Sequence, residues 1–113
     1  IANYLELEKK SYEVVFQSRF GKAKWLQPYL AKRLEELPKE NIKNIQVFCP
    51  GFVCDCLETL EEIAGESKEL FLESGGGIFN FIPCLNGDEK FIETLENIII
   101  NADQRSLNYI TLL

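Results

Sequence analysis

Apolar residues follow two patterns along the chain: short continuous runs, and recurrences three or four positions apart. Segment 12–17 is aromatic and β-branched, 45–49 is a short apolar run, and 78–85 is a third apolar run, which predicts three strands. Between them, apolar residues recur three and four positions apart over 25–37 and 57–74, which predicts two helices. Because strands alternate with helices, we expect an α/β domain with a three-layer α/β/α architecture and a parallel sheet.

Helix-ending residues support these element boundaries. Pro38 ends the first helix, the glycines at 75–77 end the second, and Asp88 can cap a third helix that buries its apolar side. Residues 1–8 resemble the end of a helix already under way. We therefore expect residues 1–113 to form a single domain that is truncated on its N-terminal side.

The charge balance narrows the function classes. The 113 residues include 12 basic and 18 acidic side chains, a net charge of −6, which argues against broad nucleic-acid binding. No apolar run approaches the roughly 20 residues of a membrane-spanning helix, and no signal peptide is evident. We expect a cytoplasmic protein, and leave peripheral contact with a membrane surface open.

Histidine is absent, which removes the commonest general base and the commonest metal ligand. Any metal must be held by carboxylates, by thiols or by a group from elsewhere. Cys54 and Cys56 lack the two-residue spacing of zinc knuckles, and Cys49 and Cys84 do not form a matching second pair. Small reduced thiols in the protein interior are the favoured interpretation of all four.

The whole net charge lies in segment 55–73, which has seven acids and one base. On an α-helix that turns about 100° per residue, five glutamates share one stripe: Glu58, Glu62, Glu66, Glu69 and Glu73. The opposite stripe is apolar: Leu60, Ile63, Ala64, Leu70 and Phe71. A solvated face of an amphipathic helix explains the pattern. Aligned like charges repel, however, and carboxylates suit hard divalent cations such as Fe²⁺ or Mg²⁺.

Several linked motifs resemble the C-terminal half of ferrochelatases, in the form common in Gram-negative bacteria. In chain order they are QSRFG at 17–21, WLQPY at 25–29, CPGF at 49–52, DCLETLEEI at 55–63 and FIPCLN at 81–86. Their order and their spacing both fit the family from about residue 12 to residue 101. The resemblance implies the C-terminal half of a two-domain chelatase fold, in which two similar α/β halves surround a porphyrin cleft.

The same resemblance implies an activity. Ferrochelatases insert Fe²⁺ into protoporphyrin IX in the last step of haem biosynthesis, without ATP. The family's histidine lies upstream of the matched region, so this chain is expected to need the upstream half of the polypeptide and to have little activity alone. Some members bind a [2Fe–2S] cluster through C-terminal cysteines. No cysteine follows Cys84 here, so we expect neither a cluster nor another cofactor.

The resemblance also assigns roles to the acids. Glu58 corresponds to the catalytic glutamate, which delivers the metal or removes porphyrin protons. Glu62 and Glu66 match an acidic trail proposed as a metal path. The predicted metal-binding residues are therefore Glu58, Glu62 and Glu66, in agreement with the independent stripe pattern.

Porphyrin-binding residues follow from the same matching. Ser18 and Arg19 match a loop that lines the cleft, and Trp25 matches an aromatic position there. Without the resemblance, Trp25 fits a core residue and Arg19 a surface charge equally well. Cys56 stands where many members have histidine, and a thiol cannot serve as the same base.

Two alternatives remain open. One is a non-catalytic acidic α/β module that binds cations or a basic partner. The other is a chelatase for a different tetrapyrrole, such as coproporphyrin. The enzyme hypothesis requires an upstream half bearing a histidine, whereas the binding-module hypothesis does not.

Overall fold

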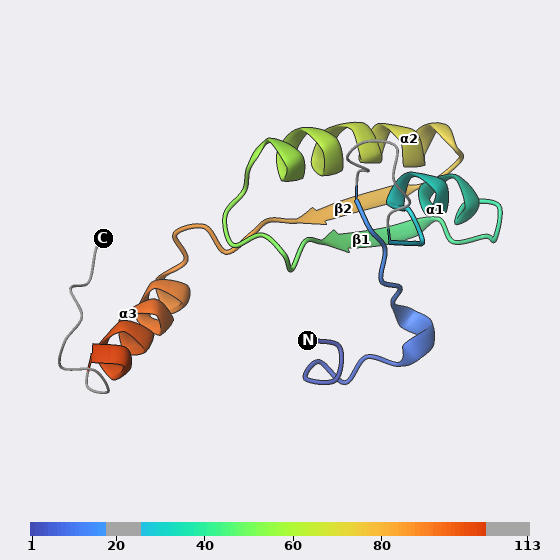
Figure 1. The fold of residues 1–113 in the computed structure, drawn as a ribbon. Coiled ribbons are helices and arrows are strands. Elements are labelled where there is room, and N and C mark those ends of the chain that lie inside the picture. Colours follow the sequence, from blue (N-terminus) through green and yellow to red (C-terminus); the bar gives the residue numbers. More distant parts are fainter. Residues whose placement is uncertain (18–25, 104–113) are drawn as a thin grey trace.

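The computed structural model describes residues 1–17 and 26–103 (Figure 1). Its elements are the 3-10 helix η1 (Lys9–Ser11), α1 (Leu30–Glu36), β1 (Asn44–Phe48), the π-helix η2 (Glu58–Ser67), α2 (Lys68–Glu73), β2 (Ile78–Ile82) and α3 (Glu89–Asp103). Figure 1 shows η2 running into α2 along one side of the strands, with α1 beside them. The predicted α/β class with a parallel sheet is confirmed.

The two strands pair in parallel, with Asn44 opposite Ile78 and Phe48 opposite Ile82. The crossover between them consists of η2 and α2, the usual way to join neighbouring parallel strands. Segment 12–17, predicted as a third strand, is extended but pairs only through a single parallel bridge from Phe16 to Tyr29 in the part that the structure describes.

The core lies between the sheet and the helices. It is formed by Leu30, Leu34, Ile63, Phe71 and Phe79. The rings of Phe71 and Phe79 are tilted, with their centroids 6.1 Å apart, a favourable aromatic arrangement. A Cβ at Gly76 would lie 2.3 Å from the Phe71 ring, so only glycine fits there. The Gly76 N–H donates to the Phe71 carbonyl and ends α2, as the glycine run predicted.

The acidic helix differs from its prediction in winding. It is a π-helix over Glu58–Ser67 and becomes α-helical only at Lys68. Because i→i+5 hydrogen bonds wind the chain more loosely than an α-helix, side chains shift around the helix axis. Ile63 is buried as predicted, but Thr59 is buried as well, whereas Leu60, which was expected on the buried stripe, is 52% exposed.

Both ends of the described chain depart from expectation. Residues 1–8 form turns rather than the end of a helix, and Glu6 has a left-handed φ of 54°. Helix α3 begins as predicted, because the Asp88 carboxylate accepts a hydrogen bond from the Phe91 N–H.

The apolar side of α3 was expected to be buried, but most of it is exposed. These residues are Ile92, Leu95, Ile98 and Ile99, and only Phe91 is half-buried. In Figure 1, α3 lies apart from the sheet and the other helices, so none of these described elements covers that side. None of the described helices is both long enough and apolar enough to cross a membrane.

Candidate functional site

Helix η2 carries three glutamates spaced four residues apart: Glu58, Glu62 and Glu66, here called the η2 acids. With i→i+5 bonding, a turn takes roughly four to five residues, so this spacing keeps the side chains near one side of the helix. Glu58 and Glu66 are exposed and Glu62 is half-buried. The predicted grouping therefore survives the change in winding.

The side-chain amide of Gln17 contacts two of the η2 acids from a distant part of the chain. Its Nε2 lies 2.9 Å from the backbone carbonyl oxygen of Glu58 and 3.0 Å from Oε2 of Glu62. Residues 1–17 and 26–103 contain no lysine or arginine that forms an ion pair with the η2 acids. The described partner of the Glu62 carboxylate is thus a neutral donor.

A cleft of about 540 Å³ opens beside these acids. It is lined by Phe16, Gln17, Tyr29, Leu30, Ala31, Lys32, Glu35, Glu62, Glu66, Ser67 and Leu70. The volume falls within the usual range of small-molecule sites. Two of the three η2 acids face this space, and Glu58 does not. The cleft thus combines aromatic side chains with carboxylates.

Asp55 joins the loops that follow the two strands. Its carboxylate accepts hydrogen bonds from Asn86 Nδ2 at 2.7 Å, from the Thr59 hydroxyl at 3.1 Å and from the Cys84 N–H at 3.2 Å. Asn86 Oδ1 accepts in return from the Asp55 N–H at 2.8 Å. The Asn86 amide is the main cause of a lowered pKa for Asp55, followed by the Cys84 N–H. This clamp lies at the carboxyl ends of the strands, where α/β proteins commonly bind ligands.

Thr59 and Cys56 set the surroundings of Glu58. The buried Thr59 hydroxyl accepts from the Cys56 N–H at 2.9 Å, which holds the first turn of η2 against Asp55. The Cys56 thiol beside Glu58 lowers the pKa of that carboxyl. Glu58 is therefore ionised at neutral pH, the state that attracts cations.

The four cysteines were expected to be reduced thiols in the protein interior, and their burial agrees only in part. All four are free; Cys84 is buried, Cys49 and Cys56 are half-buried, and Cys54 is exposed. Burial raises the pKa of Cys84 to about 11 and also raises that of Cys49, so these two thiols are protonated. In the described part of the chain, no three His, Cys, Asp or Glu side chains converge into a group that could hold a metal ion.

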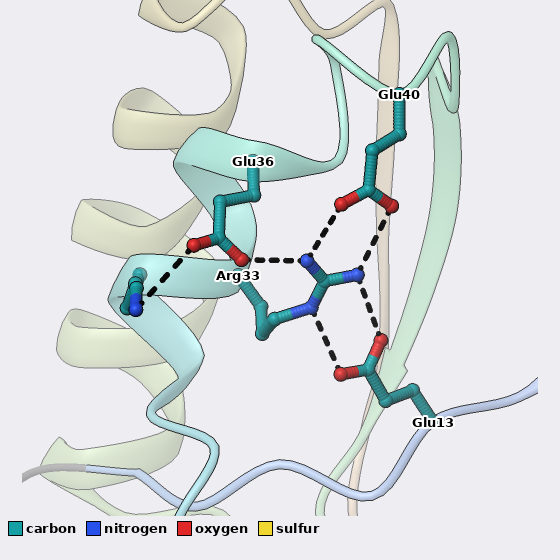
Figure 2. Close-up of polar contacts among 5 residues, drawn as sticks. Glu13, Arg33, Glu36 and Glu40 are labelled. Atoms are coloured by element: carbon teal, nitrogen blue, oxygen red, sulfur yellow. Dashed lines mark hydrogen bonds and ion pairs between the residues drawn. The ribbon is translucent and has the colours of Figure 1, made fainter.

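A second group of glutamates surrounds Arg33 (Figure 2). Arg33 donates to Glu13 through Nε at 2.8 Å and Nη2 at 3.1 Å, to Glu36 at 2.6 Å, and to both oxygens of Glu40 at 3.0 and 3.3 Å. These contacts raise the pKa of Arg33 and lower those of Glu36 and Glu40. This Arg33 cluster fastens segment 12–17 to α1, four residues before Gln17.

The predicted porphyrin-binding residues Ser18, Arg19 and Trp25 lie outside the described residues, so their roles remain predictions. Sequence reasoning placed Gln17 in a motif but gave it no role, because its partners lie 41 and 45 residues away. It placed Asp55 and Thr59 in another motif and gave neither residue a role. No local periodicity indicates such contacts.

Comparison with known proteins identifies the family. The model of the family described as Ferrochelatase matches residues 1–103. A ferrochelatase from Janthinobacterium sp. is 54% identical over 98 residues, which cover 87% of this chain and 27% of that protein. One from Methylobacillus flagellatus is 50% identical over 101 residues, covering 89% of this chain and 29% of that protein.

A third relative, ferrochelatase 1 of Shewanella oneidensis, is 50% identical over 104 residues, which cover 92% of this chain and 31% of that protein. The chain thus spans less than a third of the length of these relatives. No solved structure matches it. The family match covers nearly the whole chain, including the η2 acids, the Asp55 clamp and the predicted cleft residues, and the chain belongs to the ferrochelatase family.

Proposed function

We propose that this chain is the C-terminal part of a chelatase that inserts Fe²⁺ into protoporphyrin IX, the last step of haem biosynthesis. One observation carries the proposal: in a chain of this family, the Glu62 and Glu66 side chains line a cleft and form no ion pair with a lysine or arginine among the described residues. Such carboxylates attract a divalent cation, which is what a metal-insertion site requires.

The chemistry divides between the η2 acids. Insertion requires the porphyrin to lose its pyrrole protons and Fe²⁺ to shed its water. Glu58 is the catalytic residue, since a carboxylate can both accept a proton and bind a hard cation. The lowered pKa of Glu58 favours its cation-binding role. Glu62 and Glu66 form the metal path, because both line the cleft. Iron enters as substrate, and the protein uses no iron–sulfur cluster.

The resemblance to ferrochelatases supports a porphyrin-binding role for three residues that lie outside the described part of the chain. Trp25 stacks on the flat macrocycle, while Ser18 and Arg19 bind its edge. The upstream half of the polypeptide supplies the histidine that this chain lacks and closes the other side of the porphyrin. The protein acts in the cytoplasm without a nucleic-acid partner.

The test is anaerobic insertion of Fe²⁺ or Zn²⁺ into protoporphyrin by the full-length polypeptide, followed by absorbance. Glu58→Gln keeps the side-chain shape and removes the charge, so turnover should fall at least about 100-fold. Glu61→Gln is the matched control, because Glu61 is exposed on the same helix but is not an η2 acid. Its turnover should remain within about twofold of wild type, in line with the small effects of exposed surface changes.

The alternatives give different outcomes in the same assay. Faster turnover with coproporphyrin than with protoporphyrin would change the substrate and keep the enzyme class. A folded protein that neither turns over nor binds porphyrin, as judged by unquenched Trp25 fluorescence, would favour the acidic binding module. Unchanged turnover in Glu58→Gln would move the chemistry to another residue. Rapid insertion by the isolated 113 residues would refute the need for an upstream half.

A further inference from the structure

We infer that Gln17 is a positioning residue for metal delivery: its amide orients the Glu62 carboxylate toward the cleft without neutralising it. This inference rests on the proposed function and adds a residue to it. Gln17 and Glu62 both line the cleft, and their side chains are hydrogen-bonded at 3.0 Å.

The geometry of the amide supports an orienting role. The Gln17 NH₂ group has two hydrogens, and the structure provides two acceptors, the Glu58 carbonyl and Glu62 Oε2. The bond to the backbone carbonyl anchors the amide against the helix, so the second bond fixes one carboxylate oxygen in space. Among the described residues, no group donates a hydrogen bond to the other Glu62 oxygen, which is left for a cation.

The neutrality of the donor is the second argument. A lysine or arginine at this position would pair with Glu62 and compete directly with an incoming metal ion. An amide gives a directional hydrogen bond but no net charge, so Glu62 keeps its full attraction for Fe²⁺. Gln17 therefore reduces the rotamer freedom of Glu62 at no electrostatic cost to its function.

The segment that carries Gln17 is itself held on both sides. Four residues upstream, Glu13 forms a two-point contact with Arg33. Adjacent to Gln17, the Phe16 N–H donates to the Pro28 carbonyl, and the Phe16 carbonyl accepts from the Leu30 N–H, both at 2.9 Å. The amide is thus presented from a fixed support, as an orienting group requires.

The experiment measures KM for the metal and for the porphyrin separately, in the full-length polypeptide. Gln17→Ala should raise KM for Fe²⁺ or Zn²⁺ about fivefold, the order expected for the net contribution of a typical hydrogen bond, and leave KM for porphyrin unchanged. Gln46→Ala is the control, since Gln46 is exposed on β1 and does not line the cleft.

A double-mutant cycle separates this role from a structural one. If Gln17 acts through Glu62, then Gln17→Ala adds no further change to the metal KM of Glu62→Ala. Fully additive effects, or equal changes in both KM values, would overturn the inference. If the wild type shows no turnover, the proposed function fails, and calorimetric titration with Zn²⁺ alone decides the inference. Weaker Zn²⁺ binding by Gln17→Ala supports it, and unchanged binding overturns it.

Discussion

Two groups of three glutamates lie a short distance along the chain from each other, and their environments are opposite. In the Arg33 cluster, one guanidinium contacts Glu13, Glu36 and Glu40 at 2.6–3.3 Å. Among the η2 acids, the side-chain partners are a neutral amide and a thiol in the described part of the chain. Carboxylates paired with a guanidinium hold segments together, whereas carboxylates without a cation remain free to attract one.

Burial reinforces the difference between the two groups. The Arg33 side chain is only 16% exposed, so its contacts are partly shielded from solvent and from salt. Glu58 and Glu66 are exposed, so their attraction for a cation depends on ionic strength. The comparison therefore predicts that changes in the Arg33 cluster alter stability, and changes among the η2 acids alter metal handling.

The largest effect is expected when a guanidinium, like that of Arg33, is introduced beside the η2 acids. Gln17→Arg should pair with Glu62 and occupy the position of the metal, so Fe²⁺ insertion should fall at least tenfold, by about the strength of a charge-assisted hydrogen bond. The melting temperature should stay the same or rise. Parallel assays of turnover and thermal unfolding check both parts.

Gln46→Arg provides the charge control for this variant, because the same charge is added on an exposed part of β1. It should leave insertion close to wild type. An equal loss in both variants would show that net charge, rather than the pairing of Glu62, determines metal handling.

The sequence predicted the positions of the η2 acids along their helix, but not the partners of either group of glutamates. Apolar runs predicted β1 and β2, and spacings of three or four predicted helices, but the predicted strand 12–17 forms only a single bridge in the part that the structure describes. The spacing of four placed the η2 acids on one helix, where Glu62 and Glu66 line the cleft and Glu58 does not.

Contacts between distant segments could not be predicted in this way. The partner of Gln17 is 45 residues away, and Glu13 is 20 residues from Arg33. Only the Arg33–Glu36 contact, at a spacing of three on one helix, is of the kind that a local pattern indicates. Thr59, rather than Leu60, lies on the buried side of the helix because this segment winds as a π-helix, whereas the prediction assumed an α-helix.

The second prediction concerns stability and pH. In the Arg33 cluster, Arg33 lowers the pKa of Glu36 and of Glu40 in the folded state, below an ordinary value of 4.5. The resulting stabilisation is complete above that ordinary value and is lost as pH falls through the lowered folded-state pKa values. Arg33→Gln should therefore lower the melting temperature by several degrees at pH 7, and by progressively less below about pH 4.5.

Calorimetry of the wild type and of Arg33→Gln at pH 7, 5 and 3 measures this difference. Lys32→Gln is the control, because the Lys32 side chain is 72% exposed and forms only a 3.6 Å contact with Glu36. Its melting temperature should change little at any pH. A deficit in Arg33→Gln that stays constant from pH 7 to pH 3 would contradict the role of the carboxylates.

The third prediction tests the outer end of the proposed metal path. Glu66 is exposed and lines the cleft, and its side chain forms no hydrogen bond with another described residue. Glu66→Gln should raise KM for Fe²⁺ two- to threefold, in the range of a screened surface charge, and reduce its dependence on salt. KM for porphyrin should not change. Glu69→Gln, an exposed acid of α2 outside the cleft, should show neither effect.

The smallest effect is expected where the two regions are connected. Glu13 belongs to the Arg33 cluster, yet it lies on the segment that presents Gln17 to η2. Glu13→Gln keeps the shape of the side chain and weakens its contacts with Arg33, while Glu36 and Glu40 still bind the guanidinium. We expect the melting temperature to fall by about 1–3 °C, as for a partly exposed ion pair.

The metal KM of Glu13→Gln should also rise, by less than twofold, because a looser segment holds the Gln17 amide less firmly. The control is Glu40→Gln. This change weakens the contact between Glu40 and Arg33 but leaves Glu13 of segment 12–17 paired with Arg33. Glu40→Gln should lower the melting temperature by a similar amount and leave the metal KM unchanged. If both variants change the metal KM equally, the Arg33 cluster acts through general stability; if only Glu13→Gln does, the cluster supports metal delivery through the segment that carries Gln17.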